Sequence, residues 1–442
     1  MRQILKPNAA VMSILKKRTA SGSAYRMIKY HAETKTEDGI LLFNLLTREL
    51  LLLSEEEYAN RLNSEYLRSS WFVVPEEINE KEYVKLARLV LNTLGNNGDY
   101  IAKYTILTTT DCNARCFYCY ELGCARVPMS EETAHKTADY IINNCGGHKV
   151  ELSWFGGEPL YNASVIDLIC KRLREANIKY RSKMFTNGYL FHQENVDKAV
   201  NDWALESLQI SLDGTEEVYN KSKAYIYKTG SAYQIVMENI GRLLDAGIAV
   251  TVRLNTDLYN ADDLMVLVDE LAKRFEKNND KLEIYIFPLF DDNKPQDQRY
   301  TPEDLKLLYD KIGSLTKKVS QYGLSRMKSL RLRTAPRTRH CMADSDHTAV
   351  VRPDGNLALC DHKDEFFSHI DTQERDQAMI ESWKELCEEL PECNDCFYYP
   401  DCVRLKKCTN PISCTQYTRE QNRHSLESLM VKELMLWKEQ NT

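Results

Sequence analysis

The chain has 442 residues, of which 43% are hydrophobic and 28% are charged, and its formal net charge is −7. This length favours more than one domain, and the negative balance argues against nucleic acid as a general partner. No stretch approaches the roughly 18 consecutive apolar residues of a membrane span. The 14 cysteines are not preceded by the apolar segment of a secretory signal, so we expect reduced metal ligands in a cytoplasmic protein.

Short strands and two helices are predicted before residue 95. Strand patterns cover residues 25–30, 39–45 and 49–53, and helical patterns cover residues 54–62 and 80–94. Together they indicate a small α+β domain over residues 1–95.

Between residues 100 and 290, apolar strands alternate with helical patterns. The strand-like runs cover residues 104–107, 149–154, 180–185, 207–212, 248–254 and 282–287. Because each run is short and apolar, we expect buried parallel strands joined by crossover helices. This predicts the α/β class, with a partial (β/α)6 barrel. A linker and helix should follow over residues 291–329, then a cysteine-rich domain over 330–420 and a helix over 421–442.

The cysteines of one short loop form a C-x3-C-x2-C run, namely Cys112, Cys116 and Cys119. The run directly follows the first strand of the alternation, where parallel α/β folds place their active sites. Three thiolates can hold three irons of a four-iron cluster and leave the fourth iron open to a ligand. A zinc site is the alternative, but zinc sites usually pair two C-x2-C units or add histidines.

This cysteine run resembles the signature of the radical S-adenosylmethionine (SAM) superfamily. The resemblance implies that the open iron binds SAM and that one electron cleaves it to a 5′-deoxyadenosyl radical, which abstracts hydrogen from the substrate. The second strand ends in Trp154-Phe-Gly-Gly-Glu-Pro159, which matches the family's Gly-Gly-Glu-Pro motif. The motif implies that Gly156, Gly157 and Glu158 hold the amino group of SAM.

Other residues expected to contact SAM lie in the cysteine loop or at later strand ends. They are Tyr118, Thr186, Asn187, Ser211, Asp213, Arg253 and Asn255. Tyr118 matches the family's aromatic position, and Arg253 could pair with the carboxylate of SAM. The alternative for Asn187-Gly188 and Asp213-Gly214 is that they are ordinary turn pairs.

Eight further cysteines follow residue 330, and their spacing resembles the SPASM extension of radical SAM enzymes, which carries two auxiliary four-iron clusters. The resemblance implies one cluster on Cys341, Cys360 and Cys408, with Cys387, Cys124 or the substrate as fourth ligand. It implies a second cluster on Cys393, Cys396, Cys402 and Cys414. The spacing from Cys402 to Cys408 departs from the family pattern, and zinc ribbons are the alternative.

Asp361 follows Cys360, and the resemblance to SPASM sulfatase maturases implies that it is a base. A turn aspartate is the alternative. Because about 100 residues precede the cysteine loop, the chain also resembles maturases of ribosomally made peptides. Many of those bind a leader peptide by strand addition to a winged-helix-like element, here at residues 25–30 or 39–45.

The resemblance therefore implies three [4Fe–4S] clusters, SAM, a reductant such as flavodoxin or ferredoxin, and a precursor peptide with leader and core. The expected product is a thioether or carbon–carbon crosslink, or a related modification. One alternative is a sulfatase-maturase-like oxidase of a cysteine or serine side chain. Another is an iron–sulfur redox protein without SAM chemistry, but such a protein would not need the Gly-Gly-Glu-Pro motif.

Overall fold

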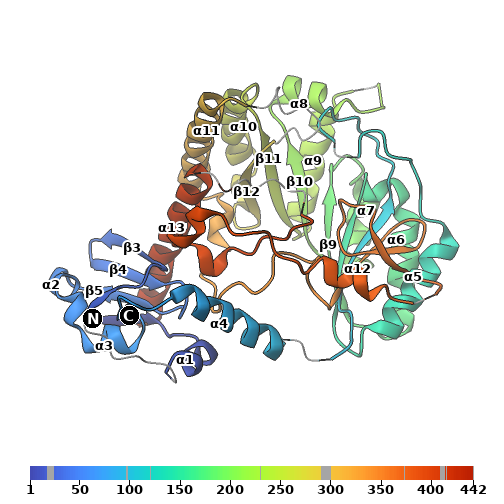
Figure 1. The fold of residues 1–442 in the computed structure, drawn as a ribbon. Helices are drawn as coiled ribbons and strands as arrows, with labels where there is room; N and C mark the ends of the chain where they lie inside the picture. Colours follow the sequence, from blue (N-terminus) through green and yellow to red (C-terminus); the bar gives the residue numbers. More distant parts are fainter. Residues whose placement is uncertain are drawn as a thin grey trace. The chain divides into compact units, whose positions relative to one another are not determined.

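The computed structural model describes residues 1–16, 24–95, 98–119, 121–228, 230–289, 300–372, 374–408, 414 and 416–441. The chain forms two compact units (Figure 1). We call them the terminal unit, comprising Met1–Gly98, Ser329–Cys341 and Lys384–Thr442, and the barrel unit, comprising Asp99–Lys328 and Met342–Trp383. Within the described part of the chain, no helix is long and apolar enough to cross a bilayer.

A nine-stranded sheet forms the centre of the barrel unit. Six of its strands are parallel to one another and stand side by side in chain order: β7 (Lys103–Thr109), β8 (Val150–Gly156), β9 (Tyr180–Thr186), β10 (Leu205–Leu212), β11 (Ala249–Thr256) and β12 (Leu282–Pro288). Beyond β7, the sheet continues with β13 (Thr348–Val351), β14 (Asn356–Ala358) and β15 (Phe366–His369). The expected α/β class with six parallel strands is confirmed, and among the described strands the sheet is open rather than closed.

Helices cover the outer face of this sheet (Figure 1). They are α5 (Glu131–Asn144), α6 (Ala163–Glu175), α7 (Gln193–Asn201), α8 (Glu216–Lys223), α9 (Ala232–Asp245), α10 (Ala261–Arg274) and α11 (Pro302–Gln321). Along β10, Leu208, Ile210 and Leu212 are buried, while Gln209 and Ser211 between them are half-buried. Because side chains alternate across a strand, the apolar positions pack under the helices and the polar ones line the inside of the partial barrel.

The terminal unit contains a four-stranded antiparallel sheet with the order β1 (Arg2–Leu5), β5 (Leu50–Leu53), β4 (Gly39–Asn44), β3 (His31–Thr36). A two-stranded sheet pairs β2 (Tyr25–Met27) with β6 (Val73–Pro75). The helices of this unit are α1 (Ala9–Lys16), α2 (Glu55–Ala59), α3 (Glu65–Ser69), α4 (Glu80–Gly95) and α13 (Gln416–Asn441). The remaining helix, α12 (Gln377–Ser382), belongs to the barrel unit.

Two strand predictions need correction. The strand expected over residues 25–30 ends at Met27, and a separate strand, β3, begins at His31. The strand expected over residues 39–45 is paired on both sides, by β3 and by β5, so it offers no free edge to a peptide. The edges of this sheet are β1 and β3.

Both ends of the chain build the core of the terminal unit. Residues of the first 98, such as Phe43 and Leu50, pack in one apolar cluster with Phe397 and with Met430 of α13. Arg88 of α4 donates a hydrogen bond of 2.9 Å to the carbonyl oxygen of Cys402. The N-terminal sheet and the cysteine-rich C-terminal segment therefore stabilise each other.

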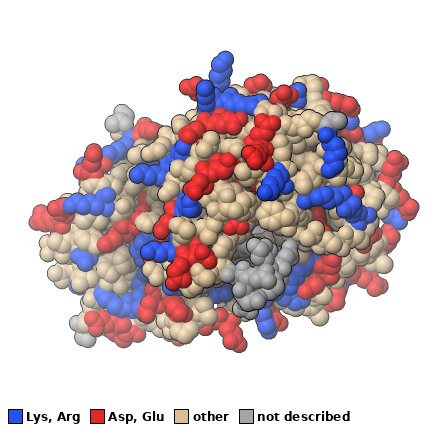
Figure 2. Space-filling view, turned by 90° about the horizontal axis from the view of Figure 1, so that it is seen from above, with Lys and Arg blue, Asp and Glu red and all other residues tan. Residues whose placement is uncertain are grey.

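Acidic and basic side chains are interspersed over the face of the molecule shown in Figure 2. This mixed surface agrees with the small excess of 65 acidic over 58 basic residues.

Candidate active site

The cysteine loop is held against the end of β8 by its backbone. The amide of Gly157 donates to the carbonyl of Thr109 over 3.0 Å, and the amide of Glu158 donates to the carbonyl of Asp111 over 3.0 Å. A Cβ atom at Gly156 or Gly157 would overlap with these carbonyl oxygens. Glycine is therefore required here because two backbones meet, which fixes the start of the loop that carries the three cysteines.

The three loop thiols are partly buried. Burial raises the pKa of Cys112 to about 12 and that of Cys119 to about 11. A thiolate in such a place needs a metal or a cation to stabilise its charge. Burial also raises the pKa of Cys116, although Lys223 opposes this effect.

The spacing of the thiols bears on the kind of metal. Among the described residues, the one group of three or more ligand atoms within 4.8 Å of one another is Cys360, Asp361 and His362. The sulfur ligands of a single tetrahedral zinc ion would stand about 3.8 Å apart, given zinc–sulfur bonds of about 2.3 Å. The three loop cysteines, all within the described part of the chain, do not form such a group.

Glu158 joins the ends of β8 and β9. Its buried carboxylate accepts hydrogen bonds from the Thr186 hydroxyl at 2.8 Å, from the Asn187 amide at 2.8 Å and from the Leu160 amide at 3.2 Å. Burial raises the pKa of Glu158 to about 7, although these donors lower it. Both oxygens are thus bonded inside the protein, and a contact of Glu158 with the amino group of SAM stays a prediction.

A buried polar network brings together four of the residues predicted to contact SAM. Tyr118 donates to Asp213 over 2.6 Å, and the Asn255 amide donates to the other oxygen of Asp213 over 3.0 Å. Lys223 lies 3.4 Å from Asp213 and donates to the Ser211 hydroxyl over 2.8 Å. The side chains of Lys223 and Asp213 are 2% and 0% exposed, so this ion pair is shielded from water.

Sequence reasoning missed Lys223. It is the last residue of α8, where a lysine is usually a solvated side chain that complements the helix dipole. Its carbonyl oxygen also accepts from the Arg115 amide over 2.8 Å, so Lys223 contacts the cysteine loop as well. One sequence signal could have found it. Asp213-Gly214 follows a predicted strand, and Lys223 ends the helix that comes directly after this pair.

Polar atoms without partners remain at this site. Asn113 accepts from Asn187 over 2.6 Å, but its own amide nitrogen has no hydrogen-bond partner in the described structure, and neither has the side-chain oxygen of Asn255. An unsatisfied buried polar group costs about 1–3 kcal/mol. A ligand rich in donors and acceptors, with a carboxylate and hydroxyls, would satisfy both atoms. The residues present therefore fit SAM, as the cysteine loop fits the cluster.

Arg253, another predicted SAM contact, also stands apart from this network. Its guanidinium carbon lies 3.7 Å from the centroid of the Phe287 ring. None of the hydrogen bonds of the network involves it in the described structure.

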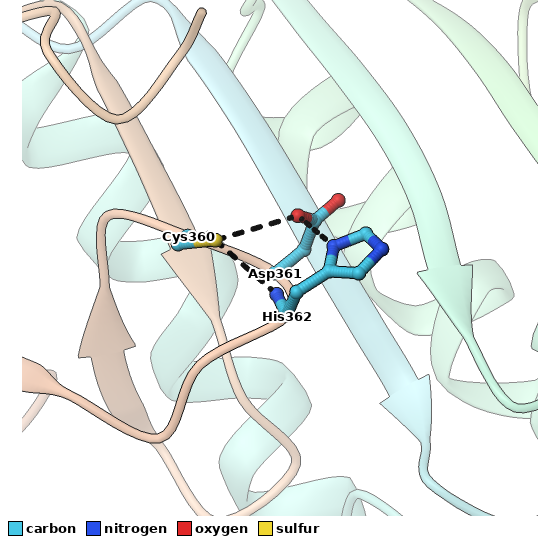
Figure 3. Close-up of side chains that lie close together, drawn as sticks. All are labelled: Cys360, Asp361 and His362. Carbon is cyan, nitrogen blue, oxygen red and sulfur yellow. Dashed lines mark hydrogen bonds and ion pairs between the residues drawn. The ribbon is translucent and has the colours of Figure 1, made fainter. Parts of the chain in front are cut away.

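The loop after β14 carries Cys360, Asp361 and His362 (Figure 3). The carboxylate of Asp361 and the imidazole of His362 face each other at 2.7 Å, and the Cys360 sulfur lies 4.0 Å from the same carboxylate oxygen. The His362 ring is 6.2 Å from the ring of Phe155, the residue before Gly156. The predicted base thus lies beside the strand end that holds the cysteine loop. Sequence reasoning did not single out His362.

The cysteines expected for the first auxiliary cluster belong to both units: Cys341 and Cys408 to the terminal unit, Cys360 to the barrel unit. The Leu405 carbonyl accepts from the Cys387 thiol at 3.3 Å and from the Cys408 amide at 3.2 Å, so these two residues are neighbours. Cys124 is exposed and lies in the barrel unit.

The cysteines expected for the second auxiliary cluster lie close enough to interact electrostatically. Burial raises the pKa of Cys402 to about 11, and the charges of Cys396, Cys414 and Cys393 raise it further. Cys396 has the same neighbours Cys414 and Cys393. These four thiols therefore lie near one another in the terminal unit, and their role as cluster ligands stays a prediction.

The fold and the site define a class: an open parallel α/β barrel whose first strand ends in a three-cysteine loop backed by Gly-Gly-Glu. Residues 106–271 match the family model described as the Radical SAM superfamily. This matched region lies within the barrel unit and contains the three-cysteine loop and the Gly-Gly-Glu segment.

Two curated relatives are similar to this chain. "Probable GTP 3′,8-cyclase" of Methanococcus maripaludis is 28% identical over 34% of this chain and 48% of its own length. The chain thus spans about half the length of this relative. "Cysteine-type anaerobic sulfatase-maturating enzyme" of Clostridium novyi is 22% identical over 66% of this chain and 84% of its own length.

Solved structures share the fold. anSMEcpe with bound AdoMet and a Cp18Cys peptide aligns with a TM-score of 0.56 and 15% identity, covering 76% of this chain and 99% of that chain. Streptococcus suis SuiB bound to the precursor peptide SuiA aligns with a TM-score of 0.51 and 12% identity, covering 86% of this chain and 94% of that chain.

Proposed function

We propose that the chain is a radical SAM enzyme that modifies a ribosomally made precursor peptide. The observation that carries the SAM part is the pair of unsatisfied buried atoms, on Asn113 and Asn255, beside a cysteine loop that backbone contacts hold in place. When bound, a four-iron cluster and SAM supply a 5′-deoxyadenosyl radical that abstracts a hydrogen atom from the substrate.

The residues of the chain have separate tasks in this proposal. Cys112, Cys116 and Cys119 hold the cluster. Lys223 offers its positive charge to the carboxylate of SAM, while Asp213 fixes the lysine through the 3.4 Å ion pair. Asp361 accepts the proton that the oxidised substrate must lose, because its partner His362 lies 6.2 Å from the ring of Phe155 near the end of β8.

The terminal unit is proposed to recognise the leader segment of the peptide. Its edge strands β1 and β3 can each accept an added strand, which gains backbone hydrogen bonds. SuiB, which shares the fold, was solved with a precursor peptide. That complex supports a peptide substrate. For the reaction, we propose a thioether or carbon–carbon crosslink or a related modification.

A sulfatase-maturase-like oxidase of a protein cysteine or serine is the second candidate. It is favoured by the relative from Clostridium novyi, which covers 66% of this chain. The two candidates differ in product. A crosslink removes two hydrogen atoms from one peptide and joins two residues, whereas oxidation of a cysteine to an aldehyde removes its sulfur.

We further propose three [4Fe–4S] clusters, with the two auxiliary ones on the sets of cysteines that follow residue 330. A one-electron reductant such as flavodoxin or ferredoxin would supply the SAM cluster. Anaerobic reconstitution should then give about 12 iron atoms per chain. An iron content near four, with zinc in stoichiometric amount, would contradict the auxiliary clusters.

The decisive experiment compares SAM cleavage in variants of the reconstituted protein. Replacing Cys112, Cys116 and Cys119 together with alanine should abolish the release of 5′-deoxyadenosine under reducing conditions. The matched control is Cys145→Ala, which removes a buried thiol at the end of α5 that is not a proposed ligand. Release of 5′-deoxyadenosine by the triple variant would show that the cluster site is wrongly placed.

A second measurement separates the two candidates. The reconstituted enzyme is incubated with short peptides encoded beside its gene and, in parallel, with a sulfatase-derived cysteine peptide. Loss of two hydrogen atoms and a tandem mass spectrum that does not fragment between two residues would support the crosslink. An aldehyde on the sulfatase peptide alone would support the maturase.

A further inference from the structure

Arg253 lies on the inner face of the partial barrel, next to Ser211 of the network around Asp213. Arg253 and Asn255 are two residues apart on β11, so their side chains point to the same face. Asn255 belongs to the network around Asp213. Arg253 instead stands between Ser211 on β10 and Tyr285 on β12, its partners in the parallel register.

Phe287 holds the guanidinium group of Arg253 in place. The 3.7 Å separation is that of a cation stacked on an aromatic face. The Nε atom of Arg253 is buried and has no hydrogen-bond partner among the described residues. A shielded donor without an acceptor is costly, and an arginine fork is suited to bind a carboxylate with two hydrogen bonds.

The surroundings of Arg253 are positively charged. Lys223 donates to Ser211, the neighbour of Arg253 on one side. Arg326 lies 5.1 Å above the ring of Tyr285, the neighbour on the other side. Both arginines lower the pKa of Tyr285, against the larger effect of burial. An anion would therefore be attracted to this row of the barrel.

Acidic side chains of the chain do not occupy this position in the described structure. Asp213 is already paired with Lys223. Glu283 lies one row further along β12, opposite Thr251, and no ion pair joins it to Arg253 among the described residues. Inner-face side chains nearby, such as Lys183 and Gln209, remain exposed or half-buried, so water and ligands can reach this face.

We propose that Arg253 forms a subsite for a carboxylate of the substrate, the side chain of an aspartate or glutamate in the modified peptide, and that it does not bind SAM. Lys223 already provides a cation at the strand ends where SAM would lie, and Arg253 lies two residues before Asn255 on β11, further from that end of the strand. The peptide part rests on the proposed function. The subsite would favour precursor peptides that carry an aspartate or glutamate in the modified segment.

The test uses the reconstituted holoenzyme with SAM and two small probes, N-acetyl-glutamate methylamide and N-acetyl-glutamine methylamide. They differ in one carboxylate. Saturation-transfer NMR should show that the wild-type protein binds the glutamate probe about tenfold more tightly, the scale of one charge-assisted hydrogen-bonded pair. Arg253→Gln should abolish this preference and leave the dissociation constant of SAM within about twofold.

The control is Arg181→Gln, which removes an arginine on β9 that is already paired with Glu151. It should keep the preference for the glutamate probe. Arg253→Lys keeps the positive charge but loses the two parallel N–H groups of the guanidinium. It should bind the glutamate probe with a weaker preference, and it provides the test if Arg253→Gln does not fold.

Two results would overturn the subsite: equal binding of both probes to the wild-type protein, or weaker SAM binding in Arg253→Gln with the probe preference unchanged. The second result would show that Arg253 binds the carboxylate of SAM instead. Probe binding does not require the enzyme to turn over. A protein that preferred the glutamate probe but modified no peptide would therefore contradict the proposed function, while the carboxylate subsite would still be supported.

Discussion

Arg48 and Asp401 form a buried two-point ion pair between residues 353 positions apart in the chain. Their side chains are 2% and 6% exposed. Asp401 precedes Cys402, a proposed cluster ligand, and its carboxylate also accepts from the Arg337 amide over 3.1 Å. The pair thus connects the N-terminal sheet to the loop that would hold the second auxiliary cluster.

Breaking this pair on one side should destabilise the terminal unit. Arg48→Met leaves the Asp401 carboxylate buried without its cation, which should cost about 3–5 kcal/mol. The double variant Arg48→Met/Asp401→Leu should recover most of this loss, because no unpaired charge remains. Thermal unfolding of the reconstituted protein measures both. Lys35→Ala, which removes an exposed ion pair with Glu55, is the control and should change little.

Deleting residues 1–95 should reduce the iron content of the protein. The deletion exposes Phe397, Met430 and the rest of the shared apolar core, and it removes Arg48 and Arg88 from the cysteine-rich loop. We expect iron to fall from about 12 to about 4 atoms per chain after reconstitution, since the barrel unit keeps the SAM cluster. A truncated protein that retained all its iron would show that the cysteine-rich segment folds alone.

The raised pKa of Glu158 predicts a pH dependence of stability. Its pKa is about 7 in the fold, against 4.5 for a glutamate in water, so the folded state binds more protons than the unfolded state between these values. The free energy of unfolding should therefore fall as the pH rises from about 4.5 to 7, by on the order of 3 kcal/mol, and level off above. Glu158→Gln should lack this slope. A slope that persists in the variant would assign it to other groups.

Lys223→Met should weaken SAM binding by about tenfold or more, the scale of a lost charge-assisted hydrogen bond. Because the substitution also leaves Asp213 unpaired, Lys223→Met/Asp213→Asn should be measured with it. The control is Lys221→Met on the exposed side of the same helix. Equilibrium SAM binding to the reconstituted protein is the readout, and unchanged affinity in both Lys223 variants would exclude the proposed carboxylate contact.

Asp361→Asn should leave 5′-deoxyadenosine release largely intact and reduce peptide product by roughly 100-fold or more, the usual effect of losing a general base. Product is measured by mass spectrometry against the nucleoside released in the same reaction. Wild-type amounts of product would exclude Asp361 as the base and leave it as a turn residue that contacts His362.

The strand pattern and the motifs could be predicted from the sequence because they are local. Each parallel strand is an apolar run, and the cysteine spacing is independent of the rest of the fold. The role of Gly157 could not be predicted, since its close neighbour is the Asp111 carbonyl 46 positions away rather than a ligand. β3 was missed because most of its residues are polar and only Ala32 is buried, so it lacks the alternation of apolar and polar residues that predicts a strand.

Tertiary contacts account for the remaining misses. Lys223 becomes part of the site because α8 ends above Ser211 and Asp213, which its own sequence does not indicate. The joint core of the terminal unit follows from contacts between segments hundreds of residues apart. Periodicity over a dozen residues carries no information on such contacts.

The shared core of the terminal unit sets an order for events on the ribosome. Its first segment ends at Gly98, but its last segment begins at Lys384. At about 5–20 residues per second, synthesis of the intervening chain takes roughly 15 to 60 s. During this interval, the barrel unit can emerge and fold while the N-terminal strands wait with their apolar side chains uncovered. We expect a nascent chain stopped before α13 to bind chaperones through its first 98 residues, and a full-length chain to release them.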